Sequence, residues 1–184
     1  EGNHGAGTGA SVGKLLGFEH AMKSGIGTCG IQVGDLQVAA IVAVNACGNV
    51  VDYETNELLA GVYDSHSGSV LKAQDVLFQQ MDALRKLPEG NTTIGCIVTN
   101  AKLDKAQCTK IAGIAHNGYA RAIHPVHTMS DGDSIFVLSS GEVEVMADAV
   151  GMLATEMMAK AIKRAVLHAE SAYGLPAHSD VICK

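Results

Sequence analysis

Apolar residues gather in three short, nearly continuous runs, and these runs predict the strands of a buried sheet. The clearest run, LQVAAIVAVNA at residues 36–46, lies between two pairs of turn-forming residues. Similar runs occupy residues 92–99 and 134–140. A strand that is apolar on both faces is typical of a sheet covered on both sides. We therefore predict a sheet that lies between layers of helices.

Three segments have the apolar spacing of amphipathic helices. They cover residues 70–86, 102–123 and 142–174. In the first of them the apolar positions are Val70, Ala73, Leu77, Met81 and Leu84. Asn100 is the expected N-cap of the second helix, and Gly174 and Pro176 are stop signals for the third. The segments expected to be loops, with short extended pieces near the start of the chain, are 1–34, 57–69 and 124–133. Residues 1–184 are expected to form one α/β domain.

Composition places the chain among globular proteins and narrows its partners. Of its 184 residues, 47% are apolar and 17% are charged, and the formal net charge is −6. The absence of a basic stripe argues against nucleic-acid binding, and the absence of an apolar run of about 20 residues argues against a membrane span. The five cysteines are scattered and odd in number, which predicts free thiols in a reducing, cytoplasmic location.

Neither the glycine-rich opening nor a pair of histidines supports a cofactor or metal site. A phosphate-binding loop would need Gly in place of Thr8, and Ser or Thr in place of Leu15. Pro125 lies between His124 and His127 and favours an extended loop, and no carboxylate stands at metal-ligand spacing. We therefore expect no cofactor and no metal ion.

Two threonines follow a turn at Gly90-Asn91 and begin a predicted strand. The simple interpretation is that Thr92 and Thr93 join a turn to a strand. The functional interpretation is that one of them is a nucleophile. A threonine hydroxyl becomes a useful nucleophile at a chain terminus, where its free α-amine, with a pKa of about 7.7–8.0, acts as the general base. That role requires the Asn91–Thr92 peptide bond to be cut first, and only one of two successive strand side chains can face a site.

Polar residues elsewhere in the chain are candidates to complete such a site. Asn45 lies near the end of the strongest strand, where its amide either makes a structural hydrogen bond to a neighbouring turn or donates to an oxyanion. The segment VHTMSDGDS at residues 126–134 places Thr128, Ser130 and Asp131 just before another strand. Turn chemistry explains this composition, and a hydroxyl–carboxylate relay beside a nucleophile is the functional alternative.

Several long motifs, in one order along nearly the whole chain, carry a resemblance to a known family. They are GNHGAGTGASVGK (2–14), VAAIVAVNACGNV (38–50), NTTIGCIVTNAKLDKAQ (91–107), AHNGYARAIHPVHTMSDGDSIFVLSSG (115–141) and AIKRAVLHAESAYGLPA (161–177). The chain resembles the DmpA-type autoprocessing aminopeptidases, which include L-aminopeptidase/D-amidase-esterases and β-peptidyl aminopeptidases. The fold that this resemblance implies is a four-layer αββα sandwich of the DmpA and ornithine acetyltransferase type, similar to that of N-terminal-nucleophile hydrolases.

The resemblance also implies a mechanism. The precursor would cut itself between Asn91 and Thr92, so that residues 1–91 end the first subunit and residues 92–184 form the second. Thr92 would become the N-terminal nucleophile, Asn45 would bind the oxyanion, and the relay would lie in the segment 128–131. The site residues that the resemblance implies are Thr92, Asn45, Thr128, Ser130 and Asp131, with cleavage after Asn91.

Members of this family carry a substantial N-terminal region before the glycine-rich motif, whereas this chain starts at Glu1 in that motif, without an initiator methionine. The resemblance implies that this chain is part of a larger precursor, whose missing N-terminal segment supplies part of the first sheet. It also implies a homo-oligomer that hydrolyses amides, esters or small peptides with a free amino group. The alternatives are an acyltransferase of the ornithine acetyltransferase type and an inactive fragment that keeps the fold.

Overall fold

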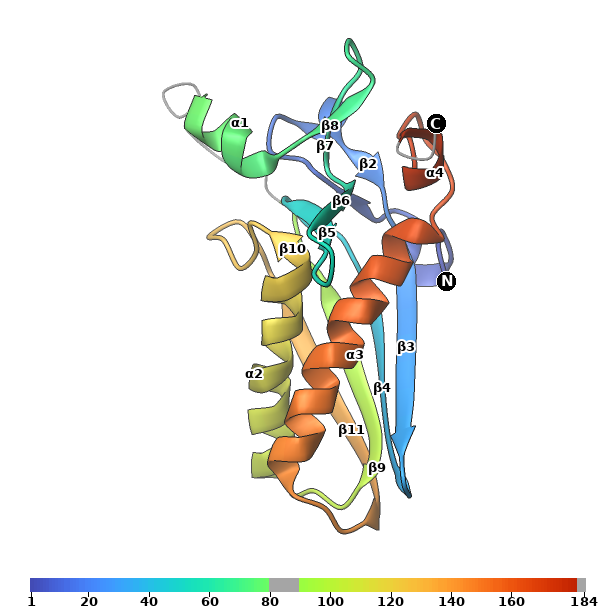
Figure 1. The fold of residues 1–184 in the computed structure, drawn as a ribbon, viewed down its shortest axis with the longest axis vertical. Coiled ribbons are helices and arrows are strands. Elements are labelled where there is room, and N and C mark those ends of the chain that lie inside the picture. Colours follow the sequence, from blue (N-terminus) through green and yellow to red (C-terminus); the bar gives the residue numbers. More distant parts are fainter. Residues whose placement is uncertain (80–89, 182–184) are drawn as a thin grey trace.

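A four-stranded sheet forms the body of the protein in a computed structural model that describes residues 1–79 and 90–181. From one edge to the other its strands are β11 (Ser134–Val143), β9 (Ile94–Ala101), β4 (Leu36–Ala43) and β3 (Ile26–Val33). The β3–β4 and β4–β9 pairs are antiparallel, and β9 and β11 are parallel. Figure 1 shows the sheet standing behind two long helices. The three predicted strands are confirmed, and β3 is a fourth strand within a segment that we expected to be mainly loops.

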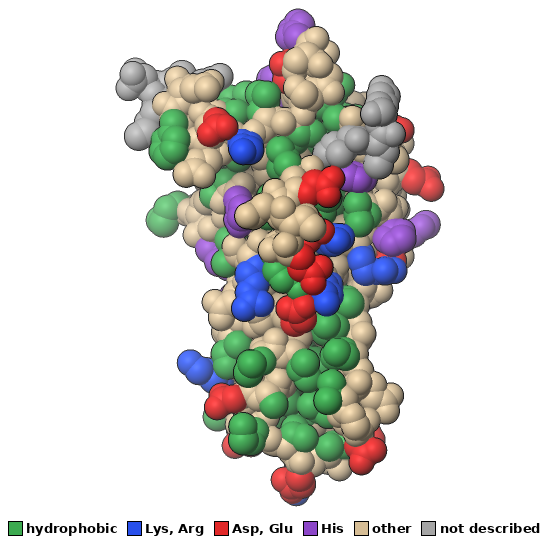
Figure 2. Space-filling model, viewed as in Figure 1, with side chains coloured by type: hydrophobic (Ala, Val, Ile, Leu, Met, Phe, Trp, Pro, Cys, Tyr) green, Lys and Arg blue, Asp and Glu red, His purple; other side chains and the backbone are tan. Residues whose placement is uncertain are grey.

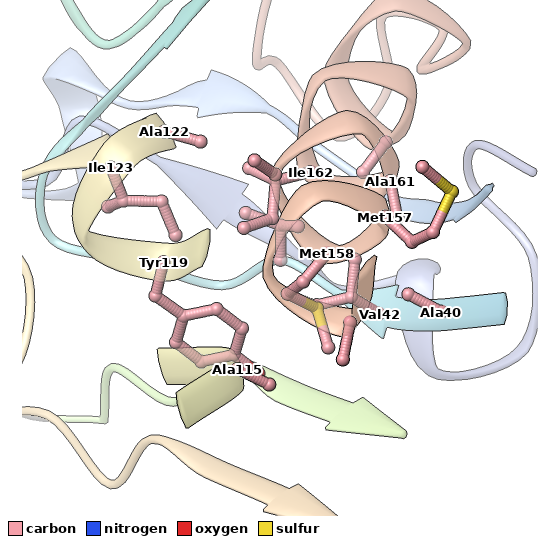
Figure 3. Packing of buried hydrophobic residues seen from close by; sticks show 14 of the residues in the cluster. Ala40, Val42, Ala115, Tyr119, Ala122, Ile123, Met157, Met158, Ala161 and Ile162 are labelled. Carbon is pink, nitrogen blue, oxygen red and sulfur yellow. The ribbon is translucent and has the colours of Figure 1, made fainter. Parts of the chain in front are cut away.

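The helices α2 (Lys105–Ala122) and α3 (Ala147–Leu167) cover one face of this sheet. Inward-facing side chains of β4 are buried against them because successive residues of a strand point to opposite faces. Figure 3 shows side chains of both helices directed into the space between helices and sheet. The labelled core residues are Ala40, Val42, Ala115, Tyr119, Ala122, Ile123, Met157, Met158, Ala161 and Ile162. Met157 and Met158 of α3 are buried in this core, whereas Met146 and Met152 are exposed.

The opposite face of the large sheet is open within the described part of the chain. Ile41 is 43% exposed, Val98 45%, Phe136 61% and Leu138 60%, and these four side chains come from three adjacent strands. The prediction that these strands are buried on both faces is therefore wrong for residues 1–79 and 90–181. Apolar composition identified the strands correctly, but what covers each face depends on which other segments pack there.

Three smaller sheets lie at one end of the large one (Figure 1). Their strands are β1 (Ser11–Val12) with β2 (Met22–Lys23), β10 (Ile123–His124) with β5 (Asn49–Asp52) and β6 (Glu57–Ala60), and β7 (Val62–Asp64) with β8 (Ser69–Leu71). The prediction of a loop over residues 57–69 is therefore wrong. Strands this short contain too few residues for an alternating pattern to stand out from a loop. The Asp64 carboxylate accepts from the main-chain nitrogen of His66 and the hydroxyl of Ser67, which closes the β7–β8 hairpin.

The boundaries of both long helices differ from those predicted. α2 begins after Asp104, whose side chain accepts from the Gln107 nitrogen while the Gln107 side chain accepts from the Asp104 nitrogen, so the N-cap is Asp104. Asn100 belongs instead to β9, where its side chain bonds to main-chain groups of Asp35 and Gln37. α3 begins at Ala147, after the predicted start at residue 142, because β11 extends to Val143, and it ends at Leu167, before the predicted stop signals.

Two remaining expectations involve residues that the structure describes only in part. The helix predicted over 70–86 begins at Ala73, because Val70 belongs to β8. It is described as α1 (Ala73–Gln79), and residues 80–86 of the prediction lie outside the described residues.

Two short 3-10 turns, η1 (Gly5–Gly7) and η2 (Phe18–His20), and the helix α4 (His178–Val181) complete the described elements. Cys29, Cys47, Cys96 and Cys108 are free thiols, and Cys183 lies outside the described residues.

Charged side chains join the sheet of β10, β5 and β6 to the outer surface of α3. Lys163 donates to Asp52 at 2.5 Å, and Lys160 pairs with Glu156 at 2.9 Å and with Glu54 at 3.8 Å. Figure 2 shows a group of charged side chains across the middle of this view and apolar side chains gathered below it, over the lower parts of the two helices. Of the two ion pairs that join α3 to this sheet, Lys163–Asp52 is shorter and more buried than Lys160–Glu54.

The close approach of α2 and α3 at Gly118 leads to a stability prediction. A Cβ atom on Gly118 would lie 2.7 Å from the Thr155 carbonyl oxygen and 2.8 Å from the Met158 Cβ atom. Gly118→Ala should therefore lower the free energy of unfolding by about 1–3 kcal/mol, because the helices must separate. Gly113 lies in the same helix with open space around its Cα, so Gly113→Ala should raise that free energy by roughly 0.5–1 kcal/mol. Chemical denaturation of both variants checks this, and equal stabilities would contradict the close packing.

Candidate active site

The turn before β9 orients Thr92 and Thr93 differently. Gly90 has a φ of +87°, a conformation that glycine adopts readily, and the chain then enters the strand through Asn91. The Thr92 hydroxyl donates to the Asn91 carbonyl oxygen at 2.6 Å, and the Thr92 main-chain N–H donates to the Asn45 carbonyl oxygen at 2.8 Å. Thr93 is fully buried, and its hydroxyl has no hydrogen-bond partner among the described residues. Of the two hydroxyls, only that of Thr92 faces the other polar residues of the turn.

The loop before β11 closes over the Asn91 carbonyl group. The Gly132 main-chain N–H donates to the Asn91 carbonyl oxygen at 2.9 Å, and Asp131 pairs with Asn91 in a parallel bridge. A Cβ atom on Gly132 would lie 2.8 Å from the Thr92 Oγ1 atom. The carbonyl that precedes Thr92 therefore receives two donors, and a Cβ atom at position 132 would force the Thr92 hydroxyl to move.

The same loop contains a hydroxyl–carboxylate pair. The Thr128 hydroxyl donates to Asp131 Oδ2 at 2.7 Å, and the Thr128 main-chain nitrogen donates to the same oxygen at 2.8 Å. Ser130 contributes its main-chain nitrogen, which lies 3.3 Å from Thr128 Oγ1. The second oxygen of Asp131 is buried and has no hydrogen bond within the described part of the chain. Thr128 and Asp131 are thus paired beside the Asn91–Thr92 bond, whereas Ser130 takes part through its backbone.

Asn45 contacts the turn through both its side chain and its main chain. Its side-chain nitrogen donates to the Gly90 carbonyl oxygen at 3.1 Å, and its Oδ1 atom accepts from Lys14 Nζ at 2.7 Å and from the Ser11 nitrogen at 3.3 Å. Because a lysine ammonium can only donate, the contact to Lys14 determines which amide atom is the oxygen. The amide N–H group therefore points toward the segment that ends at the Asn91–Thr92 bond.

Lys14 is a functional candidate that sequence reasoning missed. It is only 6% exposed, and burial is the main reason why its pKa falls from 10.5 to about 8, with the charges of Cys47 and Asp131 acting in the opposite direction. Burial also raises the pKa of the Cys47 thiol to about 11, so that this thiol stays protonated. The signal was present in the stretch SVGKLLG, where Lys14 is the one charged residue in an otherwise apolar and glycine-rich segment.

Asp133 and Tyr119 are two further residues that the sequence did not single out. Asp133 Oδ1 accepts from the Thr93 nitrogen at 2.9 Å, and the Tyr119 hydroxyl lies 3.3 Å from the Thr93 carbonyl oxygen. Both polar groups of the Thr93 backbone are therefore held by side chains. Turn chemistry accounts for an aspartate at position 133, and Tyr119 lies on a predicted helix face, so neither residue carries a distinct signal in the sequence.

The described residues show no arrangement for a metal ion and no membrane helix. Residues 1–79 and 90–181 contain no group of three or more His, Cys, Asp or Glu side chains placed to bind a metal. Among the helices in these same ranges, none combines the length and the apolar character needed to cross a bilayer. The groups placed around the Asn91–Thr92 bond are a hydroxyl, an amide, an ammonium group, a carboxylate and main-chain N–H donors.

This fold is that of known aminopeptidases. A β-aminopeptidase from Burkholderia sp. aligns with 100% of this chain and 52% of its own at a TM-score of 0.63 and 22% identity. The L-aminopeptidase D-Ala-esterase/amidase of Ochrobactrum anthropi, described as a new variant among the Ntn hydrolase fold, aligns with 100% of this chain and 51% of its own at a TM-score of 0.63 and 18% identity. The predicted fold class is confirmed, and the described residues form one helix layer and one large sheet of it.

The sequence comparisons identify the family. Residues 1–179 match peptidase family S58, and the chain belongs to this family. An uncharacterized aminopeptidase of Mycobacterium bovis is 37% identical over 186 residues, which cover 88% of this chain and 53% of the relative. The 6-aminohexanoate-oligomer endohydrolase of Paenarthrobacter ureafaciens is 30% identical over 182 residues, which cover 90% of this chain and 50% of the relative. The chain spans about half the length of these relatives.

Proposed function

We propose that the full-length protein is an autoprocessing aminopeptidase or amidase whose nucleophile is Thr92, released by cleavage of the Asn91–Thr92 bond. The observation that carries this proposal is the position of the Asn91 carbonyl group. Its oxygen lies 2.6 Å from the Thr92 hydroxyl oxygen and accepts the Gly132 N–H at 2.9 Å. A nucleophile and a donor for the developing negative charge therefore meet at one peptide bond.

Self-cleavage would proceed through an ester. The Thr92 hydroxyl oxygen attacks the Asn91 carbonyl carbon, and the Gly132 N–H stabilises the oxyanion that forms. The bond from that carbon to the Thr92 nitrogen then breaks, and the hydroxyl proton ends on the nitrogen. Water hydrolyses the resulting ester, which leaves a carboxylate on Asn91 and restores the hydroxyl of Thr92 beside a free amine.

Turnover would use the groups that cleavage exposes. The Thr92 amine, oriented by its hydrogen bond to the Asn45 carbonyl oxygen, takes the hydroxyl proton as the oxygen attacks a substrate carbonyl. The Asn45 side-chain N–H, which donates to the Gly90 carbonyl in the uncut chain, becomes free to donate to the substrate oxyanion once that segment moves away. The proton passes to the leaving group, and water hydrolyses the acyl ester on Thr92.

The substrate class proposed is amides, esters and small peptides that bear a free amino group. The support comes from the relatives, which carry names such as aminopeptidase and 6-aminohexanoate-oligomer endohydrolase, together with membership of a peptidase family. These names describe the relatives, and the chain spans about half of their length. The substrate class therefore remains our proposal for the complete protein.

We also propose that chain from outside these 184 residues covers the open face of the large sheet. The half-exposed apolar side chains of β4, β9 and β11 would lose their contact with water when a second layer packs on them, which is favourable at about 25 cal/mol per Å² of apolar surface. In the precursor that layer would include the N-terminal segment, and a homo-oligomer would bury further surface. Solvent-accessibility labelling of Phe136 in the full-length protein checks this, because a labelled ring would exclude such a cover.

Intact mass and product analysis of the purified full-length protein test the catalytic proposal. We expect two chains that meet at the Asn91–Thr92 bond, and release of the amine from aminoacyl anilides. A folded protein that never divides at this bond would contradict the proposal. Transfer of the acyl group to an added amine in preference to water would instead identify an acyltransferase.

Lys14 provides a prediction for the rate of self-cleavage. Lys14→Met removes the charged donor to Asn45 Oδ1, an interaction worth about 1.5–3 kcal/mol, so cleavage should be roughly 10–100-fold slower. Because the pKa of Lys14 is lowered to about 8, its charge is present below that pH and lost above it. The variant should be impaired most below pH 8, relative to the wild type. Time courses followed by mass spectrometry check this.

The matched control for that prediction is an exposed lysine. Lys102→Met removes a surface ion pair to Glu144, in which both side chains are well exposed, and should leave cleavage unchanged. If Lys14→Met cleaved at the wild-type rate at every pH, Lys14 would have no part in holding Asn45.

A further inference from the structure

Asp133 contacts both Thr93, the residue after the proposed nucleophile, and His127. Its Oδ1 atom accepts the Thr93 N–H at 2.9 Å, and its Oδ2 atom lies 2.9 Å from His127 Nδ1. The Asp133 side chain is only 4% exposed, and Oδ2 is buried without a hydrogen bond within the described residues. The contact with His127 is therefore an ion-pair contact rather than an aligned hydrogen bond, and its strength depends on the charge of the ring.

His127 belongs to a cluster of three rings. His116 Nδ1 lies 3.3 Å from His127 Nε2, and the Tyr119 ring stacks on His127 with centroids 5.8 Å apart. The Tyr119 hydroxyl lies 3.3 Å from the Thr93 carbonyl oxygen. The cluster thus contacts both polar groups of the Thr93 backbone, through Asp133 on one side and through Tyr119 on the other.

The groups that face His127 can be named from each element around it. Asp133 comes from the loop before β11, and His116 and Tyr119 come from α2. Burial, followed by the charge of His127, lowers the pKa of His116, while Asp133 acts in the opposite direction.

We propose that His127 is a positioning residue that acts through Asp133 to hold Thr93, and so orients Thr92 for cleavage and turnover. A charged His127 ring holds the Asp133 carboxylate more firmly than a neutral ring does, because opposite charges attract at this distance. His127 touches neither Thr92 nor the Asn91 carbonyl group in this arrangement. The inference rests on the proposed function, because it concerns the same nucleophile.

Two substitutions distinguish the effect of the charge on the His127 ring from the effect of having a polar side chain at this position. The φ of His127 is +56°, a conformation that Asn and Gly tolerate better than most residues. His127→Asn therefore keeps a polar N–H group on a compatible backbone but cannot become charged, and His127→Gly removes the side chain altogether. His124→Asn is the control, because the His124 ring is exposed and its Nε2 atom lies 3.1 Å from the Ala120 carbonyl oxygen, in the preceding helix.

The first measurement is the rate constant of self-cleavage in the full-length protein between pH 5.5 and 8.5. Taking the ratio to wild type at each pH cancels the titration of groups that all variants share. We expect His127→Asn to be roughly tenfold slower at pH 5.5 and within about twofold of wild type at pH 8.5, and His127→Gly to be slower throughout. For turnover, kcat should fall while KM stays unchanged, because the role proposed for His127 is to orient Thr92 and not to bind substrate.

The second measurement does not depend on cleavage. In uncut Thr92→Ala protein the amide proton signal of Thr93 should shift with pH as the histidines titrate, and this shift should disappear when His127→Asn is added. If His127→Gly does not fold, the His127→Asn ratio and this signal decide the question.

Distinct outcomes would overturn the two proposals. A His127→Asn to wild-type ratio that stays constant with pH, or a Thr93 signal that titrates unchanged in the His127→Asn protein, overturns the inference while the proposed function stands. A wild-type protein that folds but never divides overturns the proposed function and the inference together.

Discussion

Thr92→Ala should yield a single uncut chain with no measurable release of amine from aminoacyl anilides. The substitution removes the only hydroxyl that contacts the Asn91 carbonyl oxygen in the described part of the chain, so the ester cannot form. Thr92→Ser keeps a hydroxyl at the same atom and should still divide. Intact mass spectrometry shows division directly, and an anilide assay on the same samples measures turnover.

Thr93 provides a matched control for this experiment. Its hydroxyl is fully buried without a hydrogen-bond partner among the described residues, so Thr93→Val replaces an unsatisfied polar group with an apolar group of the same shape. Thr93→Val should therefore divide as the wild type does, at equal or greater stability. Division of Thr92→Ala together with loss of division in Thr93→Val would exchange the roles that we propose for the two threonines.

Asn45→Ala should lower turnover by about 100- to 1000-fold, the effect of removing one oxyanion donor, and should slow cleavage by roughly 10–100-fold, as Lys14→Met does, because the side chain that holds the turn is lost. The variant loses the amide N–H that points toward Gly90 and the oxygen that receives Lys14. Its main-chain carbonyl, which accepts the Thr92 N–H, remains. Rate constants from single-turnover mass spectrometry and from steady-state assays measure the two effects separately.

Asn45→Asp distinguishes the two functions of the amide. The aspartate keeps an oxygen acceptor for Lys14 and the shape of the side chain, but it has no N–H group to donate. If the donor matters, Asn45→Asp should be impaired about as strongly as Asn45→Ala. If instead the role of Asn45 is to accept from Lys14, Asn45→Asp should retain activity, which would contradict the assignment of an oxyanion donor.

Local pattern was sufficient to find the main strands and helices of this fold. Period-two burial in β4 and β9 and helical periodicity in α3 follow from the geometry of one element, so neighbouring residues in the sequence carry the signal. The helix boundaries were harder to predict, because more than one residue near a helix start has N-cap chemistry. Both Asn100 and Asp104 have N-cap chemistry, and the capping box with Gln107 selects the second. The hairpin of β7 and β8 escaped detection because its strands are three residues long.

By itself, the sequence determined where the buried strands lie, that a threonine pair follows a turn, and that Asn45 and residues 128–131 were candidate partners. Only the tertiary structure decided that one face of the sheet stays open in the described residues, that Thr92 and not Thr93 faces the Asn91 carbonyl oxygen, and that Lys14 contacts Asn45. The physical reason is separation along the chain. Lys14 lies 31 residues from Asn45, and Thr93 lies 40 residues from Asp133. Local periodicity does not indicate which buried charged residue contacts which amide, because these contacts depend on how distant strands and loops pack together.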